Sequence, residues 1–214
     1  MSWIDTFRDE YRAPLDSHGS HPKFALKRGL QDGLYLRGAG FELMFSLLLE
    51  QNLPQYHVIE TGTMRNPGNW KDGQSAFLFT EFVKHYSGWV RSVDIDSLAC
   101  DTARNAINCD QFTVTCSDSV AYLNGLSDLG TVDLFYLDSW DVKWHNDHDS
   151  AEHHLKEFQA IEAQLKPGAV VAIDDNAKFL ESSKRTGKGR RIVEYLADKN
   201  IHPKYDAYQI IYQF

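Results

Sequence analysis

The chain has 214 residues, with 22 Lys and Arg against 30 Asp and Glu, and a formal net charge of −8 at pH 7. An apolar fraction of 43% and a charged fraction of 24% are ordinary for one globular domain and argue against a disordered or fibrous chain. The acidic excess disfavours nucleic acid as a partner, because a phosphate backbone repels it. No window approaches the roughly 20 apolar residues of a membrane span, so no membrane partner is expected.

The cysteines and the first residues indicate a compartment. Cys100, Cys109 and Cys116 form no CxxC pair and cannot all pair with one another. The first ten residues carry acids where a signal peptide would carry positive charge. We therefore expect an intracellular, reducing compartment and a cytoplasmic protein.

The first 40 residues differ from the rest. Trp3 and Phe7 fit one side of a short helix, and a stretch rich in Gly, His and Ser follows. We interpret residues 1–40 as an N-terminal extension, either a lid over a site or a contact in a homo-oligomer. Residues 41–214 would then form the ligand-binding domain, starting with a helix over Phe41 to Asn52.

From residue 57 onward, strand and helix patterns alternate. Short β-branched or aromatic runs predict buried strands at residues 58–59, 90–93, 112–115, 132–137 and 169–173. The stretches between them have the apolar spacing of helices, which predicts a doubly wound, mostly parallel α/β sheet. The Tyr- and Ile-rich end, Lys204 to Phe214, predicts an antiparallel edge hairpin.

Every predicted parallel strand runs into an acid, and these acids are Glu60, Asp94, Asp118, Asp138 and the pair Asp174 and Asp175. The carboxyl ends of parallel strands share one edge of the sheet, where ligands bind. Any one acid could instead cap the next helix, but all of them together favour a site for cationic or hydroxyl-rich ligand groups. Asp94, at the end of the second strand, suits the hydroxyls of a ribose.

The first turn, Glu60-Thr61-Gly62-Thr63, is followed by a long stretch to Asp72-Gly73-Gln74-Ser75. It lacks the compact GxGxxG that wraps a pyrophosphate at a helix N-terminus. Glu60 would repel a pyrophosphate and suits a cationic ligand instead.

Two further segments, Phe135-Tyr136-Leu137-Asp138-Ser139-Trp140 and Val171-Ala172-Ile173-Asp174-Asp175-Asn176, complete a resemblance. From about Val58 to its end, the chain resembles class I S-adenosylmethionine-dependent methyltransferases. Within them it is similar to the metal-dependent O-methyltransferases of the catechol, caffeoyl-CoA and macrocin types. The resemblance implies a Rossmann-like, seven-stranded fold and metal-assisted methyl transfer from S-adenosylmethionine to a hydroxyl of a small molecule.

The resemblance also implies residue roles. The cofactor would contact Glu60, Gly62, Gly73 and Ser75 at its methionine end, Asp94 at its ribose, and Ser117 and Asp118 at its adenine, with Asp138 nearby. A divalent cation, Mg²⁺ first, would take its oxygen ligands from Asp138, Asp174, Asp175 and Asn176. Such a cation would help to ionise the substrate hydroxyl.

The catalytic base departs from the family pattern. Catechol-type enzymes have a lysine three residues after the fourth-strand aspartate, whereas this chain has Asp141 there. The nearest alternatives are Lys143 and His145, and His145 is favoured because histidine titrates near neutral pH. The metal alone is the other option.

Three other features of the sequence are each open to two interpretations. The basic segment Lys178 to Arg191 is either a lid that recognises an anionic substrate or a solvated loop. The histidines between residues 145 and 154 either lie in a solvated loop that opens a helix or contact substrate or a second metal. Trp140 either packs in the core, our default, or sandwiches a ring. As other functions, a nicotinamide-dependent oxidoreductase and a non-catalytic nucleoside-binding protein stay open.

Overall fold

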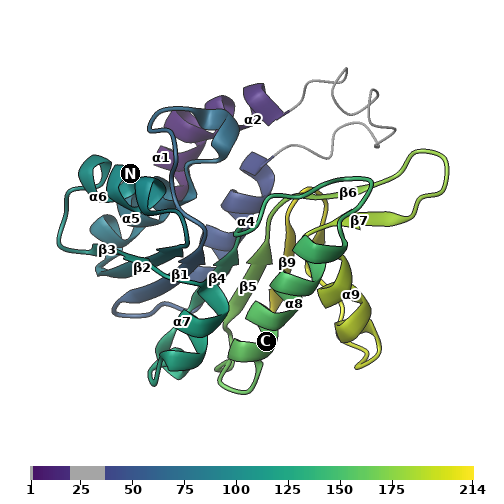
Figure 1. Ribbon diagram of the computed structural model, residues 1–214. Coiled ribbons are helices and arrows are strands. Elements are labelled where there is room, and N and C mark those ends of the chain that lie inside the picture. Colours follow the sequence, from purple (N-terminus) through teal and green to yellow (C-terminus); the bar gives the residue numbers. More distant parts are fainter. Residues whose placement is uncertain (1, 20–36) are drawn as a thin grey trace.

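The computed structural model describes residues 2–19 and 37–214, which Figure 1 shows as coloured ribbon. The helices are α1 (Trp3–Thr6), η1 (Phe7–Tyr11), α2 (Arg12–Gly19), α4 (Arg37–Glu50), η2 (Trp70–Asp72), α5 (Ser75–Tyr86), α6 (Ser97–Ala106), α7 (Ser119–Gly125), η3 (Leu129–Thr131), α8 (His148–Glu162) and α9 (Arg190–Ala197). The strands are β1 (Tyr56–Thr61), β2 (Gly88–Asp94), β3 (Phe112–Cys116), β4 (Leu134–Leu137), β5 (Val170–Ile173), β6 (Asn176–Lys178), β7 (Arg185–Gly187), β8 (Tyr205–Asp206) and β9 (Ile210–Gln213).

Within these residues, seven strands form one sheet in the order β3-β2-β1-β4-β5-β9-β8. Strand β1 pairs in parallel with both β2 and β4, whereas β9 is antiparallel to β5 and to β8. The predicted α/β sheet, mostly parallel with an antiparallel C-terminal edge, is confirmed. The order turns back on either side of β1, so the carboxyl ends of β1, β2 and β4 meet at the switch point where such sheets bind ligands.

Helices cover both faces of the sheet (Figure 1). In β4, Leu134 and Tyr136 face a core that includes α4, α5 and α6, while Phe135 and Leu137 face a second core with α7, α8 and α9. All four side chains are fully buried. This two-sided burial explains the continuous apolar runs in the sequence. No helix in the described ranges is long and apolar enough to cross a membrane.

The N-terminal segment 3–19 packs on the α4 and α5 side. The ring of Trp3 lies 5.4 Å from that of Phe45 and 6.0 Å from that of Phe82, between centroids. The lid or oligomer role of residues 1–40 stays a prediction, and its portion at residues 20–36 lies outside the described residues.

A separate two-stranded sheet, β6 with β7, follows β5. Gly187, with φ +118°, ends β7 where a Cβ atom would lie 2.2 Å from the carbonyl oxygen of Asp175, so the close approach requires glycine. The next residue, Lys188, donates its backbone N–H to the same oxygen at 3.1 Å. The hairpin thereby brings a lysine against the acids that follow β5.

Candidate functional site

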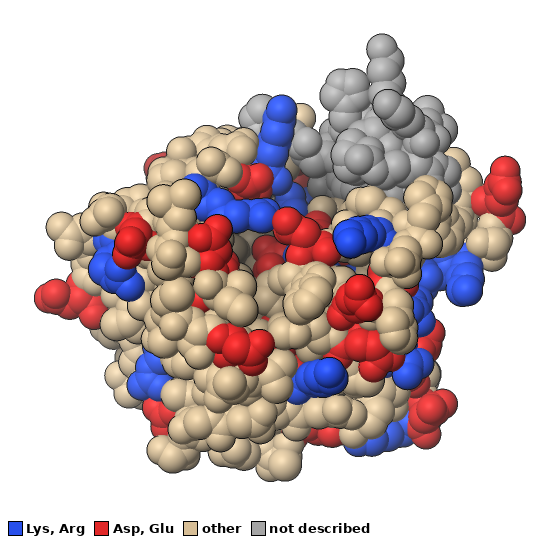
Figure 2. All heavy atoms as spheres, viewed as in Figure 1, with Lys and Arg blue, Asp and Glu red and all other residues tan. Residues whose placement is uncertain are grey.

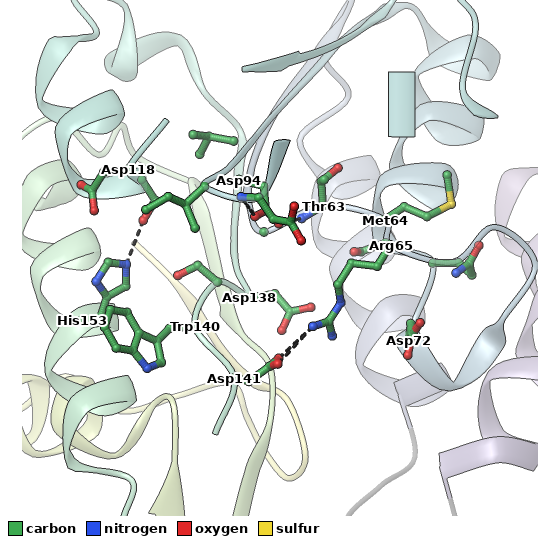
Figure 3. A pocket seen from close by; sticks show the side chains of 18 residues that line it. Thr63, Met64, Arg65, Asp72, Asp94, Asp118, Asp138, Trp140, Asp141 and His153 are labelled. Atoms are coloured by element: carbon green, nitrogen blue, oxygen red, sulfur yellow. Dashed lines mark hydrogen bonds and ion pairs between the residues drawn. The ribbon is translucent and has the colours of Figure 1, made fainter. Parts of the chain in front are cut away.

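A cavity of about 340 Å³ opens at the carboxyl ends of β1, β2 and β4 (Figure 3). Figure 2 shows acidic side chains gathered around the hollow near the centre of this face. Among the described residues that line the cavity, Arg65 is the sole Lys or Arg, against the aspartates Asp72, Asp94, Asp96, Asp118, Asp138 and Asp141. This imbalance makes the cavity electronegative and suits a ligand with positive charge.

Gly62 and Asp94 shape the wall between β1 and β2. Gly62 has φ +82°, and a Cβ atom there would lie 2.6 Å from the carbonyl oxygen of Asp138. The carboxylate of Asp94 accepts hydrogen bonds from the backbone N–H groups of Thr63 at 3.1 Å and Asp96 at 2.9 Å. These bonds hold Asp94 at the cavity, where Figure 3 shows it beside Thr63.

The structure brings together five residues that the resemblance assigns to the cofactor. These cavity-lining residues are Gly62, Ser75, Asp94, Asp118 and Asp138, whereas Glu60, Gly73 and Ser117 lie outside the lining. Asp118 also caps α7, since its Oδ1 accepts from the N–H of Ala121 at 2.8 Å. Asp118 therefore caps α7 and also lines the cavity, and its contact with a cofactor stays a prediction.

Glu60 is fully buried in β1, close behind the cavity wall. Its Oε2 accepts a hydrogen bond from Ser92 at 2.5 Å. Burial raises the pKa of Glu60 to about 7, against the opposing effect of the nearby hydroxyls of Ser75 and Ser92. A cation bound nearby would favour its ionised form.

A second buried carboxylate, Glu157 on α8, organises the floor of the cavity. It accepts hydrogen bonds from the hydroxyls of Ser139 at 2.6 Å, Thr61 at 3.1 Å and Ser119, and Nε2 of His153 lies 3.2 Å away. Burial alone would raise its pKa, but the nearby histidines and the donated hydrogen bonds hold the pKa at about 2. Glu157 thus fixes three lining side chains: Ser119, Ser139 and His153.

The rim carries an ion pair and two apolar side chains. Arg65 and Asp141 lie 3.1 Å apart across the opening, and both are more than half exposed. Such a pair contributes at most about 1 kcal/mol, so a ligand can displace it. Ile95 and Trp140 line the cavity with 76% and 57% of their surface exposed. The default interpretation of Trp140 as a core residue is wrong, because its side chain is exposed and lines the cavity.

Next to the cavity, the acids after β4 and β5 surround Lys188. Its Nζ lies 2.5 Å from Oδ1 of Asp138 and 2.8 Å from Oδ2 of Asp175, and its side chain is 1% exposed. Burial by itself would lower the pKa of Lys188, but the three carboxylates around it raise the pKa well above its ordinary value. The raised pKa favours the charged ammonium form of Lys188.

Arg37, the first residue of α4, supplies a second cation. Its guanidinium donates to Oδ2 of Asp174 at 2.9 Å, to Oδ1 of Asp175 at 3.3 Å and to the hydroxyl of Tyr208 at 3.1 Å. Tyr208 in turn donates to Asp175. Asp174 is fully buried, so Arg37 neutralises an acid that water does not reach.

These contacts test the fit of a divalent cation. The side-chain amide of Asn176 is hydrogen-bonded to the backbone. Its Nδ2 donates to the carbonyls of Ile173 and Asp174, and its Oδ1 accepts from the N–H of Gly189 at 2.7 Å. The carboxylates of Asp138, Asp174 and Asp175 are engaged by Lys188 and Arg37. In the described part of the chain, no group of three or more His, Cys, Asp or Glu side chains is arranged to hold a metal ion. The predicted ligand set, as it is placed, does not fit a metal.

The predicted bases lie apart from this cavity. Lys143 and His145 are exposed and outside its lining, and the His145 ring stacks on Phe179 with 5.3 Å between centroids. Most side chains of the basic segment form ion pairs within the chain. Arg185 pairs with Asp206, and these further members of the segment also pair with acidic side chains: Lys178, Lys188, Arg190 and Arg191.

Sequence reasoning missed Arg37, Lys188 and Glu157. In the sequence, Lys188 is one of several basic residues between Lys178 and Arg191, and Arg37 lies within the expected N-terminal extension. The sequence does contain a signal for a functional or structural role of Glu157, because this residue lies on the same buried face of α8 as Phe158 and Ile161. A charged residue on an apolar helix face needs buried partners.

No protein-family model and no curated protein matches the sequence. Among solved structures, apo CalS11, a TDP-rhamnose 3'-O-methyltransferase of calicheamicin biosynthesis, is 15% identical, with a TM-score of 0.54 over 98% of this chain and 93% of that one. An rRNA methylase from Streptococcus thermophilus is 12% identical, with a TM-score of 0.50 over 81% and 95%. The chain spans only 36% of MycE, a mycinamycin-pathway methyltransferase solved with Mg and SAH, with 76% of this chain covered at 17% identity and a TM-score of 0.48.

Proposed function

We propose that this chain, which has the fold of class I S-adenosylmethionine-dependent methyltransferases, moves a methyl group from S-adenosylmethionine to a hydroxyl oxygen of a small molecule. The bond between sulfur and methyl breaks as the bond between oxygen and methyl forms, S-adenosylhomocysteine is the leaving group, and the hydroxyl proton passes to water. The observation that carries the proposal is the electronegative cavity at the carboxyl ends of β1, β2 and β4. A sulfonium cation gains favourable energy from such a lining.

Each part of the cofactor has a counterpart in the cavity. Asp94, held by two backbone N–H groups, would accept hydrogen bonds from the ribose hydroxyls. The close approach of the Gly62 backbone to that of Asp138, which a Cβ atom would prevent, would shape the wall against which the methionine end lies. The exposed surfaces of Ile95 and Trp140 would contact the adenine, near Asp118.

A hydroxyl acceptor agrees with the polar groups at the end of β4. Asp138 and Ser139 line the cavity and offer hydrogen-bond partners to a hydroxyl that has lost its water. Positioning of that oxygen in line with the sulfonium methyl would supply much of the rate. Lys143 and His145 stay predicted bases without support from their placement, and no metal step is included because the ligand set does not fit one.

Ligand-dependent unfolding tests the proposal. A ligand at one hundred times its dissociation constant stabilises the native state by about 2.7 kcal/mol, so S-adenosylmethionine should raise the unfolding temperature. NAD should not, since Glu60 and the lining aspartates disfavour a pyrophosphate. Transfer of a tritiated methyl group to a panel of sugars and catechols would then identify acceptors. No thermal shift with millimolar S-adenosylmethionine would reject the proposal.

A further inference from the structure

The ammonium of Lys188 lies between two carboxylates at the side of the cavity where the resemblance expects a metal ion. It contacts Oδ1 of Asp138 at 2.5 Å, the carbonyl oxygen of Asp138 at 3.2 Å and Oδ2 of Asp175 at 2.8 Å. Burying an ammonium costs several kcal/mol unless oppositely charged groups compensate. The oxygen atoms that could bind a metal ion here are therefore already in contact with the Lys188 ammonium.

The charges near Lys188 disfavour a metal ion in addition to the Lys188 ammonium and the Arg37 guanidinium. Three carboxylates, on Asp138, Asp174 and Asp175, face the two cations of Arg37 and Lys188. A divalent ion would need the same oxygens at about 2.1 Å and would repel the adjacent ammonium. The ammonium and the metal ion exclude each other.

The backbone around Lys188 is built to hold it there. Gly187 and Gly189 flank the lysine, and a Cβ atom at either position would come within 3 Å of Asp175 or Asn176 atoms. Asn176 accepts from the N–H of Gly189 at 2.7 Å, and the N–H of Lys188 donates to Asp175 at 3.1 Å. The β6–β7 hairpin therefore fixes the backbone of Lys188 beside the two acids that its ammonium contacts.

We propose that the Lys188 ammonium replaces the divalent cation at this site and acts as a positioning residue that holds Asp138 at the cavity. The chain then requires no divalent metal for its site to form. Asp138 keeps Oδ1 on Lys188 while its side chain, 21% exposed, reaches the cavity. The link to methyl transfer rests on the proposed function, whereas the exclusion of a metal ion does not.

Mn²⁺ alone, without S-adenosylmethionine, is the probe. The electron paramagnetic resonance signal of free Mn²⁺ falls when the ion binds, so titration counts sites directly. We expect no site in the wild type and one in Lys188→Ala, which frees Asp138 and Asp175. Adding Asp175→Asn to Lys188→Ala should remove the new site. Lys184→Ala, an exposed lysine before the same hairpin strand, should behave like the wild type.

Each result of these titrations either supports or overturns the proposal. A wild-type Mn²⁺ site that Asp175→Asn removes would overturn the proposal, and so would a folded Lys188→Ala variant that gains no site. If Lys188→Ala unfolds because its carboxylates are left unpaired, Mn²⁺ should restore its circular dichroism spectrum, and failure to do so counts against the proposal. Wild-type methyl transfer should persist in EDTA. Absence of transfer with the Mn²⁺ results intact would reject the proposed function alone.

Discussion

Nε of Arg37 donates a hydrogen bond to Oδ2 of Asp174 at 2.9 Å, across 137 positions of sequence. Because Asp174 is fully buried, Arg37→Met should leave an uncompensated charge and lower the free energy of unfolding by roughly 3–5 kcal/mol. Urea denaturation measures this, and adding Asp174→Asn should recover part of the loss.

The matched control is Arg104→Met, which removes a pair with Asp101 whose side chains are both more than half exposed. Its cost should stay within about 1 kcal/mol. Equal losses in Arg37→Met and Arg104→Met would contradict the assigned role of Arg37.

Glu157 should make stability depend on acid pH. Its pKa is about 2 in the folded chain against an ordinary 4.5, so its contribution is complete above pH 4.5 and is lost as pH falls from 4.5 to 2. The shift corresponds to about 3 kcal/mol at most. The difference in unfolding free energy between wild type and Glu157→Gln should therefore shrink across this window. Glu152→Gln, on the same helix but partly exposed, should show no such change.

Glu60 should act with the opposite sign. Its pKa of about 7 lies above the ordinary 4.5, so the stability of its buried neutral form is complete below pH 4.5 and is lost as pH rises toward 7. Glu60→Gln should remove this loss and flatten the stability curve between those values. A curve that keeps the wild-type slope in this range would refute the assignment.

Gly62→Ala should impair both stability and cofactor binding. The new Cβ atom would lie 2.6 Å from a backbone oxygen of Asp138, in addition to the strain of φ +82°. Gly68→Ala separates backbone strain from the steric clash, because Gly68 has φ +76° but open space around it. Calorimetric titration with S-adenosylmethionine should show a loss of affinity for Gly62→Ala alone.

Asp94→Asn should weaken S-adenosylmethionine binding by at least about tenfold, since one charge-assisted hydrogen bond contributes roughly 1.5–3 kcal/mol. An asparagine would also keep an acceptor oxygen for only one of the N–H groups of Thr63 and Asp96 and would place its NH2 group against the other. Calorimetry measures the change, with Asp101→Asn as a surface control on α6. Equal affinities for the two variants would remove Asp94 from the ribose role.

The sheet and the position of the cavity followed from the sequence because they depend on local pattern. Apolar runs marked β1 to β5, and parallel topology then placed Asp94 and Asp138 at one edge, where both line the cavity. Residue spacing carries this information directly.

The cations around the acids did not follow, since they depend on tertiary contacts. The helix expected from residue 41 begins at Arg37, and these four residues include the partner of Asp174. Lys188 directly follows β7, and β7 is held in place by pairing with β6, a strand of only three residues. No periodicity predicts which of several lysines in such a segment turns inward.

The contacts of Arg37 also set an order of events during synthesis. Its partners Asp174, Asp175 and Tyr208 leave the ribosome long after Arg37 itself. Contacts of such long sequence separation form late and slow folding. A nascent chain can therefore form its first strands early, but the charge balance beside the cavity is complete only once residue 208 has emerged.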